Sequence, residues 1–148
     1  PAPESLPPAA GRQHTIPVRY DGPDLAELAD RHGLSIAEVI QRHTASELHV
    51  RCLGFMPGFG YLSGLDPTLH TPRRDTPRTV VPAGSVAIGG EHAGIYPVPS
   101  PGGWNLIGLC PTRMFDPDRN PSMPVKVGDR VRFEAIDRAT FTVMGGKL

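Results

Sequence analysis

Proline and glycine interrupt this sequence so often that long, unbroken helices or strands are excluded from its middle part. The chain has 18 prolines and 17 glycines in 148 residues, and 24 of these lie between Gly54 and Gly128. Proline restricts φ and lacks a backbone N–H, and glycine readily adopts the positive φ of tight turns. Because 39% of the residues are hydrophobic, the pattern predicts one packed domain of short elements joined by ordered turns.

Charge and hydropathy exclude two classes of partner. The 15 basic and 15 acidic residues cancel, and no run of like charges exceeds two residues, so we expect no nucleic acid partner. No apolar stretch approaches the roughly 20 residues that cross a bilayer, so we expect no membrane partner. Cys52 and Cys110 are far apart; they fit buried thiols in a reducing compartment, and one disulfide is also compatible with the sequence. We therefore expect a cytoplasmic protein.

The N-terminal part of the chain predicts a linker, a strand and two short helices. Residues 1–13 are proline-rich and aperiodic, as in a linker, which places the folded domain at residues 14–148. The run His14–Tyr20 predicts a strand. A helix over Asp24–His32 should end at Gly33, and a second should begin at the capping box of Ser35 and Glu38 and end near His43. The expected apolar faces are Leu25, Leu28 and Ala29 in the first helix, and Ile36, Val39 and Ile40 in the second.

After the second helix the periodicity becomes that of short strands divided by turns. This pattern indicates a mainly β domain, either an antiparallel sandwich or a barrel. The expected strands are Leu48–Leu53, Thr79–Ile88, Gly94–Val98, Asn105–Cys110, Arg130–Ile136 and Ala139–Met144.

The sequence lacks the common catalytic signatures. We find no phosphate-binding lysine loop, no serine elbow and no paired-histidine metal motif, and the six histidines match no metal-site spacing. We therefore expect this chain to bind neither ATP nor a metal by itself.

Four clusters rich in glycine and proline are the candidates for a site. In the first, Gly54–Leu62, the rings of Phe55, Phe59 and Tyr61 either line a pocket or fill a corner of the core, and both interpretations remain open. The second, Thr71–Arg78, repeats Thr-Pro-Arg at a spacing of five. In an extended chain residues five apart point to opposite sides. One of its two repeated arginines should therefore face a pocket, and the other should face the surface or a structural carboxylate.

The third and fourth clusters place polar groups among apolar ones. Ser85 and Tyr96 lie on otherwise apolar strands, which suits hydrogen bonding to a small ligand, and each also fits a structural role. The fourth, Ser100–Trp104, is either an amide nest beside the single tryptophan or a tight hairpin that anchors it. His43 ends the second helix, where the helix dipole favours the protonated form.

Taken in order, these clusters resemble a known family. The runs are G-F-x-P-G-F-x-Y-L from Gly54, T-P-R-x-x-T-P-R-x-x-V-P-A-G-S-V from Thr71, G-I-Y-P-x-x-S-P-G-G-W-x-L-I-G from Gly94, and G-D-R-V-R-F from Gly128. The series is similar to the 5-oxoprolinase B subunit, whose family is also labelled allophanate hydrolase subunit 1 or Kip-type kinase inhibitor. The resemblance extends from about residue 16 to residue 133.

The resemblance implies a cyclophilin-like closed β-barrel, here with two short N-terminal helices. Members of the family usually carry a small α/β domain in front, which is absent from this sequence, so residues 1–13 resemble the linker that would follow it. The resemblance also implies a second cyclophilin-like protein as partner, of the kind represented by the 5-oxoprolinase C subunit, also labelled allophanate hydrolase subunit 2. ATP would be used by the assembled complex, with no cofactor bound by this chain.

The resemblance further implies a pocket for a small amide or carboxylated substrate. Where members usually have Gln-Thr-Gly-Ile-Tyr-Pro, this chain has His92 and Ala93 before Gly94, which could change the ligand preference. The residues expected around the pocket are His43, Phe55, Phe59, Tyr61, Arg73, Arg78, Ser85, His92 and Tyr96.

Three functions compete on these features. The leading hypothesis is a non-autonomous hydrolase subunit of an ATP-dependent complex that acts on C–N amide bonds, with Arg78 on the substrate's anionic group and Ser85 and His43 orienting the substrate. The alternative is a regulatory module that inhibits a sensor histidine kinase. Converging polar residues beside a glycine-rich loop favour the first hypothesis. Prolyl isomerisation rests on fold analogy alone, and the sequence has no matching catalytic constellation.

Overall fold

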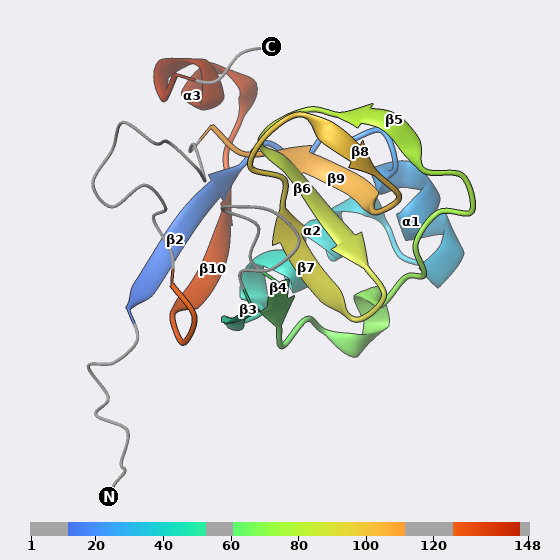
Figure 1. Ribbon diagram of the computed structural model, residues 1–148, viewed down its shortest axis with the longest axis horizontal. Helices are drawn as coiled ribbons and strands as arrows, with labels where there is room; N and C mark the ends of the chain where they lie inside the picture. Colours follow the sequence, from blue (N-terminus) through green and yellow to red (C-terminus); the bar gives the residue numbers. More distant parts are fainter. Residues whose placement is uncertain (1–11, 53–60, 112–125, 146–148) are drawn as a thin grey trace, which may run out of the picture.

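The computed structural model describes residues 12–52, 61–111 and 126–145, which form a mainly β fold with a few helices (Figure 1). Seven strands form one sheet in the order β2-β10-β3-β4-β7-β6-β9, and β5 pairs with β8 in a two-stranded ribbon. The elements are β2 (Gln13–Val18), α1 (Leu25–His32), α2 (Ile36–Ala45), β3 (Leu48–Cys52), β4 (Tyr61–Ser63), η2 (Pro67–Leu69), β5 (Arg78–Val81), β6 (Ser85–Gly89), β7 (His92–Ile95), β8 (Ser100–Gly102), β9 (Asn105–Leu109), β10 (Arg130–Ala135) and α3 (Arg138–Val143).

The two helices near the N-terminus form as their capping signals predict. Gly33 ends α1 at φ 67°, the left-handed conformation that a residue without Cβ adopts at least cost. In α2 both hydrogen bonds of the Ser35–Glu38 capping box are present. The expected apolar face of α2 is partly wrong, because Ile36 is 44% exposed while Val39 and His43, one turn apart, take the buried positions.

The sheet brings the two ends of the described chain together. β10 runs parallel to β2, so the expected antiparallel arrangement holds for the other strand pairs only. The sheet also curls, because its two edge strands, β2 and β9, come together at one end. Arg19, which follows β2, and Leu109, the last residue of β9, exchange two backbone hydrogen bonds of 2.8 and 2.9 Å. A closed barrel remains a prediction.

Three of the expected strands differ in the structure. The strand expected over Gly94–Val98 is displaced, since β7 spans His92–Ile95 and ends before Pro97, which lacks a backbone N–H for pairing. The run Thr79–Ile88 contains two strands, β5 and β6, because a turn with Gly84 at φ 86° separates them. The strand expected over Ala139–Met144 is wrong, because these residues belong to helix α3. Asp137 caps this helix by accepting a hydrogen bond from the Thr140 amide at 2.8 Å, and this local bond favours the helical turn.

The buried hydrophobic residues form two clusters, one in the main core and one at the candidate site. The larger lies between the sheet and the two N-terminal helices, where α1 packs against β9 and α2 against β10. The smaller lies where the β5–β8 ribbon covers β6 and β9, and it consists of Val81, Ala87, Tyr96, Trp104 and Leu106. Among the described residues, no helix is long and apolar enough to cross a membrane.

Candidate functional site

A cavity of about 360 Å³ opens beside the smaller cluster. Tyr61 enters it from the start of β4, Tyr96 from the end of β7, and Trp104 from the turn before β9. We call it the aromatic cavity; its lining residues are Tyr61, Arg73, Arg74, Pro77, Tyr96, Pro101, Gly102, Gly103 and Trp104. Three of the predicted site residues, Tyr61, Arg73 and Tyr96, therefore meet here.

Two glycines allow the aromatic rings to lie where they do. A Cβ on Gly89 would come within 2.5 Å of the Trp104 ring, and one on Gly102 within 2.1 Å of the Tyr96 hydroxyl. The Tyr61 ring lies with its centroid 5.8 Å from that of Trp104 and 5.9 Å from that of His92. His92 contacts the Tyr61 ring edge-on and is not among the residues that line the aromatic cavity.

Tyr96 supplies a buried hydroxyl to this cavity. Burial raises the pKa of Tyr96, and a hydrogen bond from the Trp104 backbone opposes the rise. The hydroxyl therefore keeps its proton at neutral pH.

The tandem arginines differ in their contacts, although each lines a cavity. The Arg73 guanidinium lies 5.9 Å from the centre of the Trp104 ring. Arg78 donates from Nη1 and Nη2 to the two carboxylate oxygens of Asp24 at 2.8 and 2.7 Å. The arginine that meets a structural carboxylate is thus Arg78, the residue expected on the anionic group of a substrate.

Asp24 is a central residue of this region that no sequence pattern singled out. It is 3% exposed, and it also accepts hydrogen bonds from Arg74 at 2.9 Å and from the Leu106 amide at 2.7 Å. Burial alone would raise the pKa of Asp24, but these hydrogen bonds and the two guanidinium charges hold it below its ordinary value. Its place just before α1 is the only signal in the sequence, and it suggests a helix cap, yet the side chain forms no cap bond.

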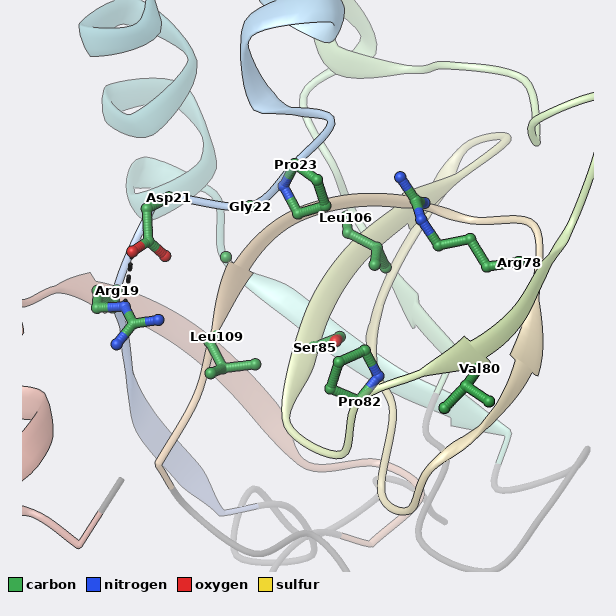
Figure 2. Close-up of a pocket in the computed structure, with 11 residues that line it drawn as sticks. Arg19, Asp21, Gly22, Pro23, Arg78, Val80, Pro82, Ser85, Leu106 and Leu109 are labelled. Atoms are coloured by element: carbon green, nitrogen blue, oxygen red, sulfur yellow. Dashed lines mark ion pairs between the residues drawn. The ribbon is translucent and has the colours of Figure 1, made fainter. Parts of the chain in front are cut away.

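Arg78 and Ser85 line a second cavity of about 300 Å³, which we call the serine cavity. Figure 2 shows the Arg78 side chain on one side of it and the Arg19–Asp21 ion pair, 2.8 Å long, on the other. Ser85 is 2% exposed and lies among Pro82, Leu106 and Leu109. The predicted site residues are therefore divided between two cavities.

His43 lies in the larger core and lines neither cavity. Its ring stacks on Phe133 with centroids 4.5 Å apart, and Nδ1 forms a hydrogen bond with the Tyr20 hydroxyl. Burial lowers the pKa of His43 to about 3, so the expected protonated form is wrong: the cost of burying the charge exceeds the attraction of the helix dipole. Phe55 and Phe59 lie outside the described residues.

Metal-ligating side chains are dispersed in the part of the chain that the structure describes. There, no group of three or more histidine, cysteine, aspartate or glutamate side chains could hold a metal ion. The side chains that line the two cavities offer hydrogen-bonding hydroxyls, guanidinium cations and aromatic rings.

The sequence and the fold match a known class of domain. Residues 2–125 match the family model described as carboxyltransferase domain, subdomain C and D. The chain is 51% identical over 121 residues to the 5-oxoprolinase B subunit of Escherichia coli O157:H7, and 45% identical over 129 residues to that of Bacillus subtilis. It belongs to the family of 5-oxoprolinase B subunits. These alignments cover 80% and 85% of the chain but only 56% and 54% of those relatives, so the chain spans about half of their length.

Solved structures show the same fold. The conserved uncharacterised protein PH0987 from Pyrococcus horikoshii superposes with a TM-score of 0.85 at 45% identity, over 88% of this chain and 62% of that one. The Kluyveromyces lactis urea carboxylase superposes with a TM-score of 0.71 at 19% identity, over 90% of this chain and 14% of that one. The second likeness shows the fold alone.

Proposed function

We propose that this chain is a non-autonomous subunit of an ATP-dependent complex that hydrolyses the C–N amide bond of 5-oxoproline or a closely related small amide. The observation that carries the proposal is the aromatic cavity, with the Arg73 cation beside Trp104, in a chain 51% identical to a 5-oxoprolinase B subunit. The cavity volume of about 360 Å³ lies in the lower part of the range, about 300–1,000 Å³, of small-molecule sites.

The arrangement suits binding better than bond cleavage by this chain alone. The aromatic cavity holds no activated nucleophile among its described residues: Ser85 lies in the other cavity, and His43, the expected partner, lies in the core. Cleavage would therefore depend on groups that other subunits supply. We propose a second cyclophilin-like protein as the partner, with ATP used by the assembled complex in the cytoplasm and not bound by this chain.

Reconstitution tests this proposal. The chain is co-expressed with subunits of the 5-oxoprolinase A and C types, and ATP-dependent hydrolysis of 5-oxoproline is measured with and without it. We expect activity only when this chain is present, and a large loss when Trp104→Leu removes one aromatic wall. Arg132→Ala, an exposed position on β10, is the matched control and should keep the full rate. Full activity of a complex lacking this chain, or no hydrolysis by the complete complex, would contradict the proposal.

A further inference from the structure

We infer that Arg73 binds the carboxylate of a small planar amide ligand in the aromatic cavity. Asp24 leaves this role to Arg73 because it binds the two other arginines of the same segment. The identity of the ligand rests on the proposed function. The assignment itself rests on the contacts of three arginines that are close in sequence and differ in what they touch.

Asp24 binds two donors of Arg78 and one donor of Arg74. Arg78 forms a two-point ion pair with it, and Arg74 divides Nη1 between Asp24 at 2.9 Å and Glu27 at 3.0 Å. A guanidinium held by two parallel hydrogen bonds to a buried carboxylate has little to gain from a second carboxylate. The charges of both arginines are therefore already paired with carboxylates of this chain, and Arg78 alone forms the two-point pair.

Arg73 has the opposite surroundings. It lines the aromatic cavity and is exposed, and its guanidinium contacts the Trp104 ring without an ion pair to any of the described residues. Packing on an aromatic face orients the guanidinium while leaving its N–H groups available. Of the two arginines that line this cavity, Arg73 is thus the one that no described carboxylate pairs, and it can offer its planar fork to a ligand carboxylate.

The remaining walls fit the rest of such a ligand. Tyr61 and Trp104 present aromatic surface to a flat ring, and the Tyr96 hydroxyl lies at the same cavity with its proton retained. A five-membered lactam that carries a carboxylate has the matching features, namely an anionic group, a flat amide and an apolar edge. The geometry therefore favours a planar carboxylated amide over a neutral amide or a flexible amino acid.

Trp104 makes the binding measurable, because it is the single tryptophan of the chain. The 148-residue chain is titrated with 5-oxoproline while its tryptophan emission is recorded. We expect saturable binding that weakens at least about 10-fold in Arg73→Ala and by an intermediate factor in Arg73→Lys, which keeps the charge but loses the fork. Arg132→Ala should bind as the wild type does. Unchanged affinity in Arg73→Ala would overturn the inference.

Arg78→Ala provides the reciprocal test. We expect it to lower the midpoint of thermal unfolding and, while folded, to keep its affinity for 5-oxoproline within about 3-fold of the wild type. Arg73→Ala should leave the midpoint unchanged. Loss of binding in folded Arg78→Ala, together with normal binding in Arg73→Ala, would reverse the assignment.

A neutral analogue isolates the carboxylate. 2-Pyrrolidinone has the lactam without the carboxylate, so it should bind weakly and equally to the wild type and Arg73→Ala; a difference between them would contradict the assigned contact. Binding and catalysis also separate the two proposals. A complex that hydrolyses 5-oxoproline while the chain shows no Arg73-dependent binding overturns this inference alone, whereas Arg73-dependent binding in a complex without activity overturns only the proposed function.

Discussion

His43 should make the stability of this domain depend on pH already between about pH 7 and pH 5, above the range in which most carboxylates titrate. The ring is completely buried and neutral, and burial lowers its pKa to about 3 from an ordinary value of 6.5. In the unfolded chain the same ring takes up a proton as the pH falls below 6.5. The contribution of His43 to stability is therefore constant above pH 6.5, is lost as the pH falls from 6.5 towards 3, and falls no further below that.

The magnitude follows from the difference between the two pKa values. Each pH unit within this range changes the free energy of unfolding by about 1.4 kcal/mol for one proton. Between about pH 7 and pH 5 the wild type should thus lose about 2 kcal/mol through His43, a large part of the roughly 5–15 kcal/mol typical of a small domain.

Urea unfolding at about pH 7 and pH 5 measures this loss. His43→Leu replaces the ring by an apolar side chain that can pack on Phe133, so its unfolding free energy should change about 2 kcal/mol less between the two pH values. The variant loses the hydrogen bond to Tyr20, and this loss changes the free energy of unfolding equally at both pH values. His49→Gln on β3 serves as the control and should keep the wild-type dependence. Equal losses in the wild type and His43→Leu would refute the reasoning.

Three further substitutions test structural contacts described above. Asp24→Asn removes a buried charge that two arginines share, and we expect about 3 kcal/mol of destabilisation by urea unfolding; no change would show that the network is dispensable. Gly89→Ala places a methyl group against the Trp104 ring, so it should shift the tryptophan emission and weaken ligand binding, and an unchanged spectrum would contradict the close packing. Asp137→Ala removes the cap bond to the Thr140 amide, and it should lower the free energy of unfolding in urea, unlike Asp137→Asn, which retains a cap.

The sequence could predict those parts of the fold that depend on near neighbours. The Ser35–Glu38 box and the Gly33 end of α1 involve residues within a few positions of one another, so their patterns are complete in a short window. The final helix could not be predicted in this way, because the apolar residues in Ala139–Met144 suit a strand as well as a helix. Only Phe141 in α3 is buried, and the Asp137 cap favours the helical form.

The candidate site could be predicted in its members but not in its arrangement. Tyr61, Arg73 and Tyr96 are expected together and do line one cavity. Ser85 is expected with them but lies in the serine cavity. His43 is expected there too, but its position on α2 turns it into the core, where desolvation suppresses its charge. A side chain's polarity in the sequence does not reveal which of two faces of a fold it will meet.

By itself the sequence determined the family and the short β elements with their two capped helices. These follow from motif order and from local hydrogen bonds. Only the tertiary structure decided which arginine is engaged, because Asp24 is 50 residues from Arg74 and 54 from Arg78 in the chain. A buried carboxylate binds the guanidinium groups that the fold brings within hydrogen-bond distance. That distance depends on long-range contacts, such as those of Asp24 with the Leu106 amide and of the Arg74 amide with the Gly103 carbonyl, and not on any neighbouring residue in the sequence.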